Sequence, residues 1–186
     1  MKQTRFLGIL SLLGGITAVP LLIAFTITDW GEPGTAVYQT YELLNRLMTG
    51  SLLLMSAGWL GLYLRNDRYG RWATLLALLG SLMMVIGTAA EFWLFSDLPY
   101  AGQNLRHMAF STFSFGSLLL DVGATAVGIA TFRSHIWPRW SAIILLLALP
   151  LDMVAFLWLN AIFLTTAVLS LVVGYNLLKV NRDESL

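Results

Sequence analysis

Two aspartic acids in the second half of the sequence, Asp121 and Asp152, lie within long apolar stretches. A charge at the centre of a bilayer costs at least about 2.5–3.5 kcal/mol, so such a residue usually has a partner or a function. With a helical rise of about 1.5 Å per residue, each acid lies about 18–20 Å from one end of its stretch. In a hydrocarbon core about 30 Å thick, both acids are therefore expected near the middle of the membrane.

Two carboxyl groups at one depth predict a site for a proton or a cation, because like charges close together favour a shared proton. Pro150 lies just before Asp152, and a proline removes one helical hydrogen bond and can bend the helix beside the acid. The alternative is that each aspartic acid is neutral and has a structural role, in which its hydrogen bond to a neighbouring helix holds the two helices together. No Lys or Arg is expected at this depth, which disfavours a structural salt bridge.

A second group of ionisable residues is predicted at the outer surface of the membrane. Glu42 and Arg46 are four residues apart and can pair on one helix. His107 titrates in the physiological range, which suits proton entry, and two arginines there suit the phosphate of a lipid head group. An ordinary solvated interface with one ion pair is the alternative. The residues of this predicted vestibule are Glu42, Arg46, Glu91, Arg106 and His107.

Polar residues recur along the apolar stretch that contains Asp121, at steps of three, four or seven positions. This spacing places them on one face of a helix. Such a stripe on a membrane helix is expected to face protein or water, because an unsatisfied polar group is costly in lipid. Besides Asp121, the stripe contains Ser111, Ser114 and Thr125.

The composition indicates which kind of element must position these side chains. Of the 186 residues, 58% are hydrophobic and 11% are charged, and the mean hydropathy is +0.75. A soluble domain carries roughly 25% charged residues, and a chain this apolar would expose large apolar patches in water. Soluble enzymes and disordered chains are therefore excluded, and a net charge of only +1 argues against binding to nucleic acid. An all-α polytopic membrane protein remains.

A single transmembrane domain with six helices is predicted over residues 1–186. A helix needs about 20 apolar residues to cross the hydrocarbon core, and the stretch from Trp140 to Leu178 would be about 58 Å long as one helix. We therefore divide it near Leu157–Asn160, whereas an undivided helix would give five spans. The predicted spans are 6–28, 47–64, 72–95, 108–132, 140–157 and 161–178.

The basic residues predict the orientation of the spans. With six spans, all of the 11 Lys and Arg residues except Arg46 and Arg106 fall on one side of the membrane. Short loops rich in Lys and Arg face the cytoplasm, so we expect both termini there. The short loops and the basic N-terminus favour a bacterial cytoplasmic (inner) membrane.

A short run of residues occurs twice: Gly50–Leu54 recurs as Gly116–Leu120, and each run leads to a loop of the form Arg-x5-Arg-Trp. This predicts a parallel repeat in which spans two and three, and spans four and five, are duplicated hairpins. Repeats of this kind occur in transporters. Chance is the alternative, because Gly, Ser and Leu are common in membrane helices and the orientation rule places arginines in both loops.

No motif in the sequence defines a chemical reaction. The zinc motif His-Glu-x-x-His, the phosphate-binding P-loop and the Gly-x-Ser-x-Gly nucleophile elbow are absent. Without cysteine there is no thiolate site. We therefore expect no catalytic residue, no cofactor and no metal site, and we lean against an enzyme.

Three functions are compatible with these features. A structural or accessory subunit of a membrane assembly is favoured, with the lipid bilayer and other membrane subunits or further copies of the chain as partners, and no nucleic acid. The first alternative is a small transporter or channel that uses the two aspartic acids for protons, a cation or a small solute. The second is an intramembrane enzyme or lipid-binding protein that uses the outer cluster.

Overall fold

The computed structural model describes residues 2–28, 31, 34–65, 70–99, 104–159 and 163–183. Over these residues the fold is all-helical, as the sequence predicts, with seven α-helices and one π-helical turn. Asn160 and residues 161–162, where the predicted turn ends and the sixth span begins, lie outside the described residues. The elements are α1 (Lys2–Ile27), α2 (Ala36–Arg65), α3 (Arg71–Ala89), η1 (Ala90–Leu94), α4 (Leu105–Ser134), α5 (Arg139–Leu146), α6 (Ala148–Leu159) and α7 (Leu164–Asp183).

Four stretches of the described chain are long and apolar enough to cross a membrane: Gln3–Ile27, Ala36–Arg65, Arg71–Leu94 and Leu105–Ser134. They correspond to α1, α2, α3 continued by η1, and α4. The three remaining helices are shorter, and the apolar part of α7 is Leu164–Lys179. These helices are compatible with an integral membrane protein, while a count of six spans and the internal repeat stay predictions.

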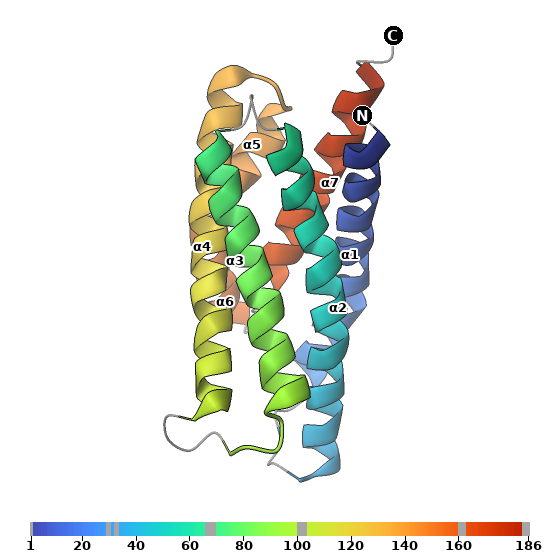
Figure 1. The fold of residues 1–186 in the computed structure, drawn as a ribbon, viewed down its shortest axis with the longest axis vertical. Helices are drawn as coiled ribbons and strands as arrows, with labels where there is room; N and C mark the ends of the chain where they lie inside the picture. Colours follow the sequence, from blue (N-terminus) through green and yellow to red (C-terminus); the bar gives the residue numbers. More distant parts are fainter. Residues whose placement is uncertain are drawn as a thin grey trace.

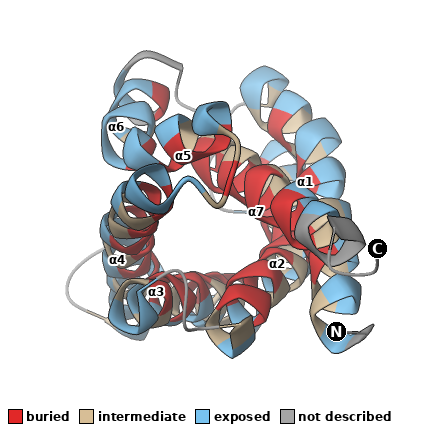
Figure 2. Ribbon diagram, turned by 90° about the horizontal axis from the view of Figure 1, so that it is seen from above, coloured by how far each residue is buried: buried red, intermediate tan, exposed pale blue. Residues whose placement is uncertain are grey.

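The helices form an elongated bundle whose long axis follows α1 to α4 (Figure 1). α1 begins and α7 ends at the same end of this bundle, which also holds the link from α2 to α3 and the link from α4 to α5 (Figure 1). α3 packs against α4, and α1 packs against both α2 and α7. Seen along the axis, the buried residues lie on the inner faces of the helices, and α6 lies at an outer corner with much of its surface exposed (Figure 2).

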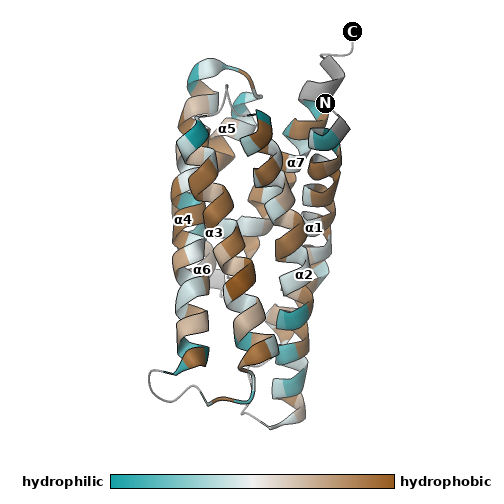
Figure 3. Cartoon of the chain, in the orientation of Figure 1, coloured by the Kyte–Doolittle hydropathy of each residue, from teal (hydrophilic) through white to brown (hydrophobic). Residues whose placement is uncertain are grey.

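The outer surface of the bundle is apolar, while many polar side chains lie inside it. Phe6, Ile16 and Ile23 of α1 are more than half exposed, whereas Ser51, Ser81 and Thr131 are buried. Hydrophobic residues run along the middle of the helices, and hydrophilic residues gather toward the ends, most clearly on the lower part of α2 (Figure 3). This distribution suits a hydrocarbon surrounding, in which polar groups must be satisfied within the protein.

Glycines bring α3 and α4 into backbone contact. A Cβ atom added to Gly116 would lie 2.8 Å from the carbonyl oxygen of Gly80 and 2.8 Å from the backbone nitrogen of Met84. A Cβ atom on Gly87 would lie 2.5 Å from the backbone nitrogen of Phe113. Because backbone atoms cannot move aside as a flexible side chain can, these positions need glycine, in the manner of close-packed membrane helices.

A pair of serines joins the first helix to the last. The Ser11 hydroxyl on α1 lies 3.0 Å from the carbonyl oxygen of Ser170 on α7, and the Ser170 hydroxyl lies 2.8 Å from the carbonyl oxygen of Ser11. The two hydroxyl oxygens are 2.9 Å apart. Interhelical hydrogen bonds of this kind hold helices together where lipid provides no hydrophobic driving force. The contact closes the bundle between its two terminal helices.

Candidate functional site

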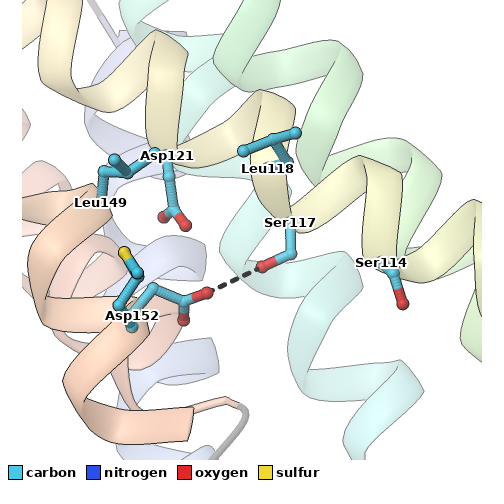
Figure 4. Close-up of a pocket in the computed structure, with 7 residues that line it drawn as sticks. Ser114, Ser117, Leu118, Asp121, Leu149 and Asp152 are labelled. Atoms are coloured by element: carbon cyan, nitrogen blue, oxygen red, sulfur yellow. Dashed lines mark hydrogen bonds between the residues drawn. The ribbon is translucent and has the colours of Figure 1, made fainter. Parts of the chain in front are cut away.

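Asp121 on α4 and Asp152 on α6 face each other across one cavity (Figure 4). The cavity has a volume of about 250 Å³. The acids that the sequence places at one depth are thus neighbours in space, since α6 packs against α4. The other residues that line the cavity are Ser114, Ser117, Leu118, Leu149 and Met153.

Within the described part of the chain, the polar neighbours of each acid are the other acid and hydroxyl groups, and no Lys, Arg or His is among them. The Ser117 hydroxyl donates to Oδ2 of Asp152 over 3.4 Å (Figure 4), and Thr165 of α7 also faces this carboxyl group. The Oδ1 atom of Asp152 is buried and has no hydrogen-bond partner among the described residues. Asp121 is only 4% exposed. Among the described residues, each acid thus has the other acid as its ionisable neighbour, and Asp152 also has the hydroxyl groups of Ser117 and Thr165.

This arrangement has a clear electrostatic consequence. Two ionised carboxylates cannot lie side by side in an apolar site without compensation, because each carries a large desolvation penalty and they repel each other. Since the described neighbours supply no positive charge, the compensation must be a proton or a bound cation. A protonated pair of carboxyl groups and a pair that holds a cation both meet this requirement.

A helix interruption positions Asp152 beside the cavity. α5 ends at Leu146 and α6 begins at Ala148, with Leu147 between them. Pro150 has no N–H with which to bond the carbonyl of Leu146 one turn earlier. The break between α5 and α6 therefore lies directly after the residue whose carbonyl loses its helical partner. The helix then resumes, since the Leu151 N–H donates to the carbonyl of Leu147 over 2.9 Å.

The predicted polar stripe on α4 divides between the outer surface and the interior. Ser111 and Ser114 are exposed, and their hydroxyls donate to the carbonyls of His107 and Phe110 one turn earlier. Ser114 also lies at the edge of the cavity. The hydroxyl of Thr125, one turn beyond Asp121, is buried without a hydrogen-bond partner among the described residues. A serine on the outer surface is tolerated because its own helix satisfies the hydroxyl.

At the other end of α4, Arg106 is the centre of the predicted outer cluster. Its side chain is 1% exposed. Its guanidinium donates to the carbonyls of Ser96 over 2.7 Å and of Leu98 over 2.8 Å, and also to the hydroxyl of Tyr38. It lies 3.9 Å from the Glu42 carboxylate. These contacts tie α2, the link before α4 and α4 itself to one another.

Arg46, Glu42 and Glu91 complete this outer cluster. Arg46 Nε donates to the carbonyl of Phe92 over 2.8 Å, and its guanidinium lies 3.8 Å from Glu42. Glu91 is buried and belongs to the π-helical turn η1, as does Phe92. π-helical turns often occur at functional sites. Here the turn places the carbonyl of Phe92 within reach of Arg46. Both arginines of the cluster therefore bind groups of the protein itself.

His107 lies apart from these contacts, because it is exposed on the helix face next to that of Arg106. Its backbone N–H donates to the side chain of Asn104, which caps α4.

Sequence reasoning missed Tyr38, Ser117 and Thr165. Ser117 could have been found, since it lies one helical turn before Asp121, whereas Thr165 depends on how α7 packs.

No group of three or more His, Asp or Glu residues that could hold a metal ion occurs in the described part of the chain. Comparison with protein-family models, with curated proteins and with solved structures gives no match. The acid pair and its cavity are therefore the observations on which a function can be based.

Proposed function

We propose that this chain is a small membrane transporter that binds a proton or a monovalent cation between Asp121 and Asp152. The observation that carries this proposal is the meeting of two carboxyl groups at a cavity with no basic neighbour among the described residues. Exchange of a proton for a cation keeps the charge of the site constant, so loading and unloading need not leave a bare charge in the membrane. The hydroxyls of Ser117 and Thr165 would supply further oxygen ligands.

The proposed topology has six spans with both termini in the cytoplasm of a bacterial cell. Two features support it: α1 begins and α7 ends at the same end of the bundle (Figure 1), and that end carries the basic helix ends. α2 ends at Arg65, α3 begins at Arg71 and α5 begins at Arg139. α5 and α6 together would form the fifth span, interrupted at Leu147, and α7 would form the sixth.

The proposal predicts that cations and protons stabilise the purified protein through the acid pair. Titration with Na⁺, K⁺ and Li⁺ at several pH values should raise the stability of the wild-type protein, by about 2.7 kcal/mol when the ion is present at 100 times its Kd. Without a cation, stability should fall as pH rises, because loss of the protons leaves like charges together. The measurement is thermal unfolding in detergent, followed by ion flux into proteoliposomes.

Asp121→Asn and Asp152→Asn should each remove this response and the flux. Asp97→Asn is the matched control, because Asp97 is an exposed acid in the link between η1 and α4. A response that is equal in all four proteins would contradict the proposal. A flat response in all of them would do so too, and would leave the acids as neutral helix contacts in a structural or accessory subunit.

A further inference from the structure

The acid-pair cavity has an opening with a distinct chemical character. Leu118 on α4 is 49% exposed and Met153 on α6 is 57% exposed, and both line the cavity. Leu149 on α6 is exposed as well. The two carboxyl groups lie deeper between the same helices (Figure 4). The cavity therefore opens on the outer surface of the bundle, between α4 and α6, with an acidic floor and a mouth that is apolar except for Ser114.

The acidic floor has unused binding capacity. Asp121 is 4% exposed and lines the cavity, and its nearest ionisable neighbour among the described residues is the other acid, Asp152. Oδ1 of Asp152 is buried without a hydrogen-bond partner in the same part of the structure. Buried polar atoms are normally satisfied. Both carboxyl groups line the cavity and have no basic neighbour among the described residues. A ligand in this cavity is therefore expected to carry positive charge.

The mouth of the cavity indicates which kind of cation would reach this floor. If the outer surface of the bundle faces lipid, a small hydrated ion would have to shed its water to enter between Leu118 and Met153, which is costly. An organic ammonium ion with an apolar tail gathers at the membrane and would place its tail on these side chains. The charge of an organic ammonium ion is spread over a larger volume than that of Na⁺, so moving it to the acids costs less desolvation energy.

We infer that the cavity is a binding site for an amphiphilic organic ammonium ion, which enters from the bilayer between α4 and α6. This inference rests on the proposed function, because it names the class of cation that the acid pair takes. The ammonium group lies against Asp121 and Asp152 and displaces a proton. The alkyl part lies against Leu118, Leu149 and Met153.

The test is saturable binding of hexyltrimethylammonium to the full-length protein in lipid nanodiscs, with empty nanodiscs as the background. Tetramethylammonium has the same charge without the tail and should bind about tenfold more weakly or worse, since each buried methylene adds affinity. Hexanol has the tail without the charge and should not compete. Equal affinity for both ammonium ions, or competition by hexanol, would overturn the inference.

Variants separate the floor of the cavity from its mouth. Asp121→Asn should abolish saturable binding, and Leu118→Trp should weaken it at least tenfold by filling the mouth while leaving both acids in place. Leu53→Trp is the matched control, because Leu53 is an exposed leucine on α2, away from the residues that line the cavity. Binding that survives Asp121→Asn, or that responds alike to both tryptophan variants, would overturn the inference.

The wild-type protein distinguishes failure of this inference from failure of the proposed function. If Na⁺ or protons stabilise the protein through the acids but hexyltrimethylammonium shows no saturable binding, the inference is wrong and the proposed function stands. If neither kind of cation has an effect that depends on Asp121, both are wrong.

Discussion

Replacing Arg106 with alanine is expected to destabilise the protein by about 3–5 kcal/mol, because two hydrogen bonds from a buried charged group are lost, each worth about 1.5–3 kcal/mol. The change would leave the carbonyls of Ser96 and Leu98 without the Arg106 donor, and Glu42 with Arg46 as its ion-pair partner. It would also release the link before α4, which Arg106 holds through these carbonyls. Unfolding in mixed micelles with increasing sodium dodecyl sulfate measures the loss.

Arg133→Ala is the control for this prediction, because Arg133 lies in the last turn of the same helix and is exposed. A surface change of this kind usually alters stability by less than about 0.5 kcal/mol. Arg106→Lys should have an intermediate effect, since lysine keeps the charge but lacks the planar fork that serves several acceptors. Equal effects of Arg106→Ala and Arg133→Ala would mean that the cluster is solvated and contributes little.

The helical architecture was largely predictable because long apolar stretches leave few alternatives to a helix in a membrane. The predicted boundary at Phe95 lies one residue beyond η1, and the expected effect of Pro150 falls at the break between α5 and α6. The sequence does not indicate that Ala90–Leu94 is a π-helical turn. That departure depends on the side chains and carbonyls around it, which come from other helices.

The proximity of Asp121 and Asp152 was predictable from their depth, because residues at the same depth on neighbouring antiparallel helices lie close together. The outer cluster was predicted only as a group. Its membership depends on rotation about the helix axis: Arg106 points inward and His107, its neighbour in sequence, is exposed. The carbonyls that Arg106 binds belong to the link between η1 and α4, and no pattern of residue types predicts the course of that link.

The repeated run gives a sharper example, because matching residues have different surroundings. A Cβ atom on Gly116 would meet the backbone of α3, whereas a Cβ atom on Gly50 would meet nothing within 4 Å. A duplicated hairpin would be expected to use equivalent glycines in equivalent contacts. The similarity of the two runs therefore carries no information about packing, whatever its origin.

Gly116→Ala and Gly50→Ala are accordingly expected to change stability in opposite directions. At Gly116 the added methyl group would push α4 away from Gly80 and Met84 on α3, and overpacking of this kind costs about 1–3 kcal/mol. At Gly50 the methyl group would enter open space, and alanine is the better helix former by roughly 0.5–1 kcal/mol. The same unfolding measurement in mixed micelles compares the two variants.

The changes in stability of the Gly116→Ala and Gly50→Ala variants show whether the two runs make equivalent contacts, as a repeat would, or different ones. If the two runs were equivalent halves of a repeat with the same contacts, both variants would lose similar stability. If the α3–α4 contact is as close as the distances at Gly116 indicate, Gly116→Ala loses stability and Gly50→Ala does not. Gly80→Ala should lose stability as well, because the same two backbones meet at Gly80. Since α4 carries Asp121 and Ser117, displacing it should also weaken the cation response of the acid pair, which links this packing contact to the proposed function.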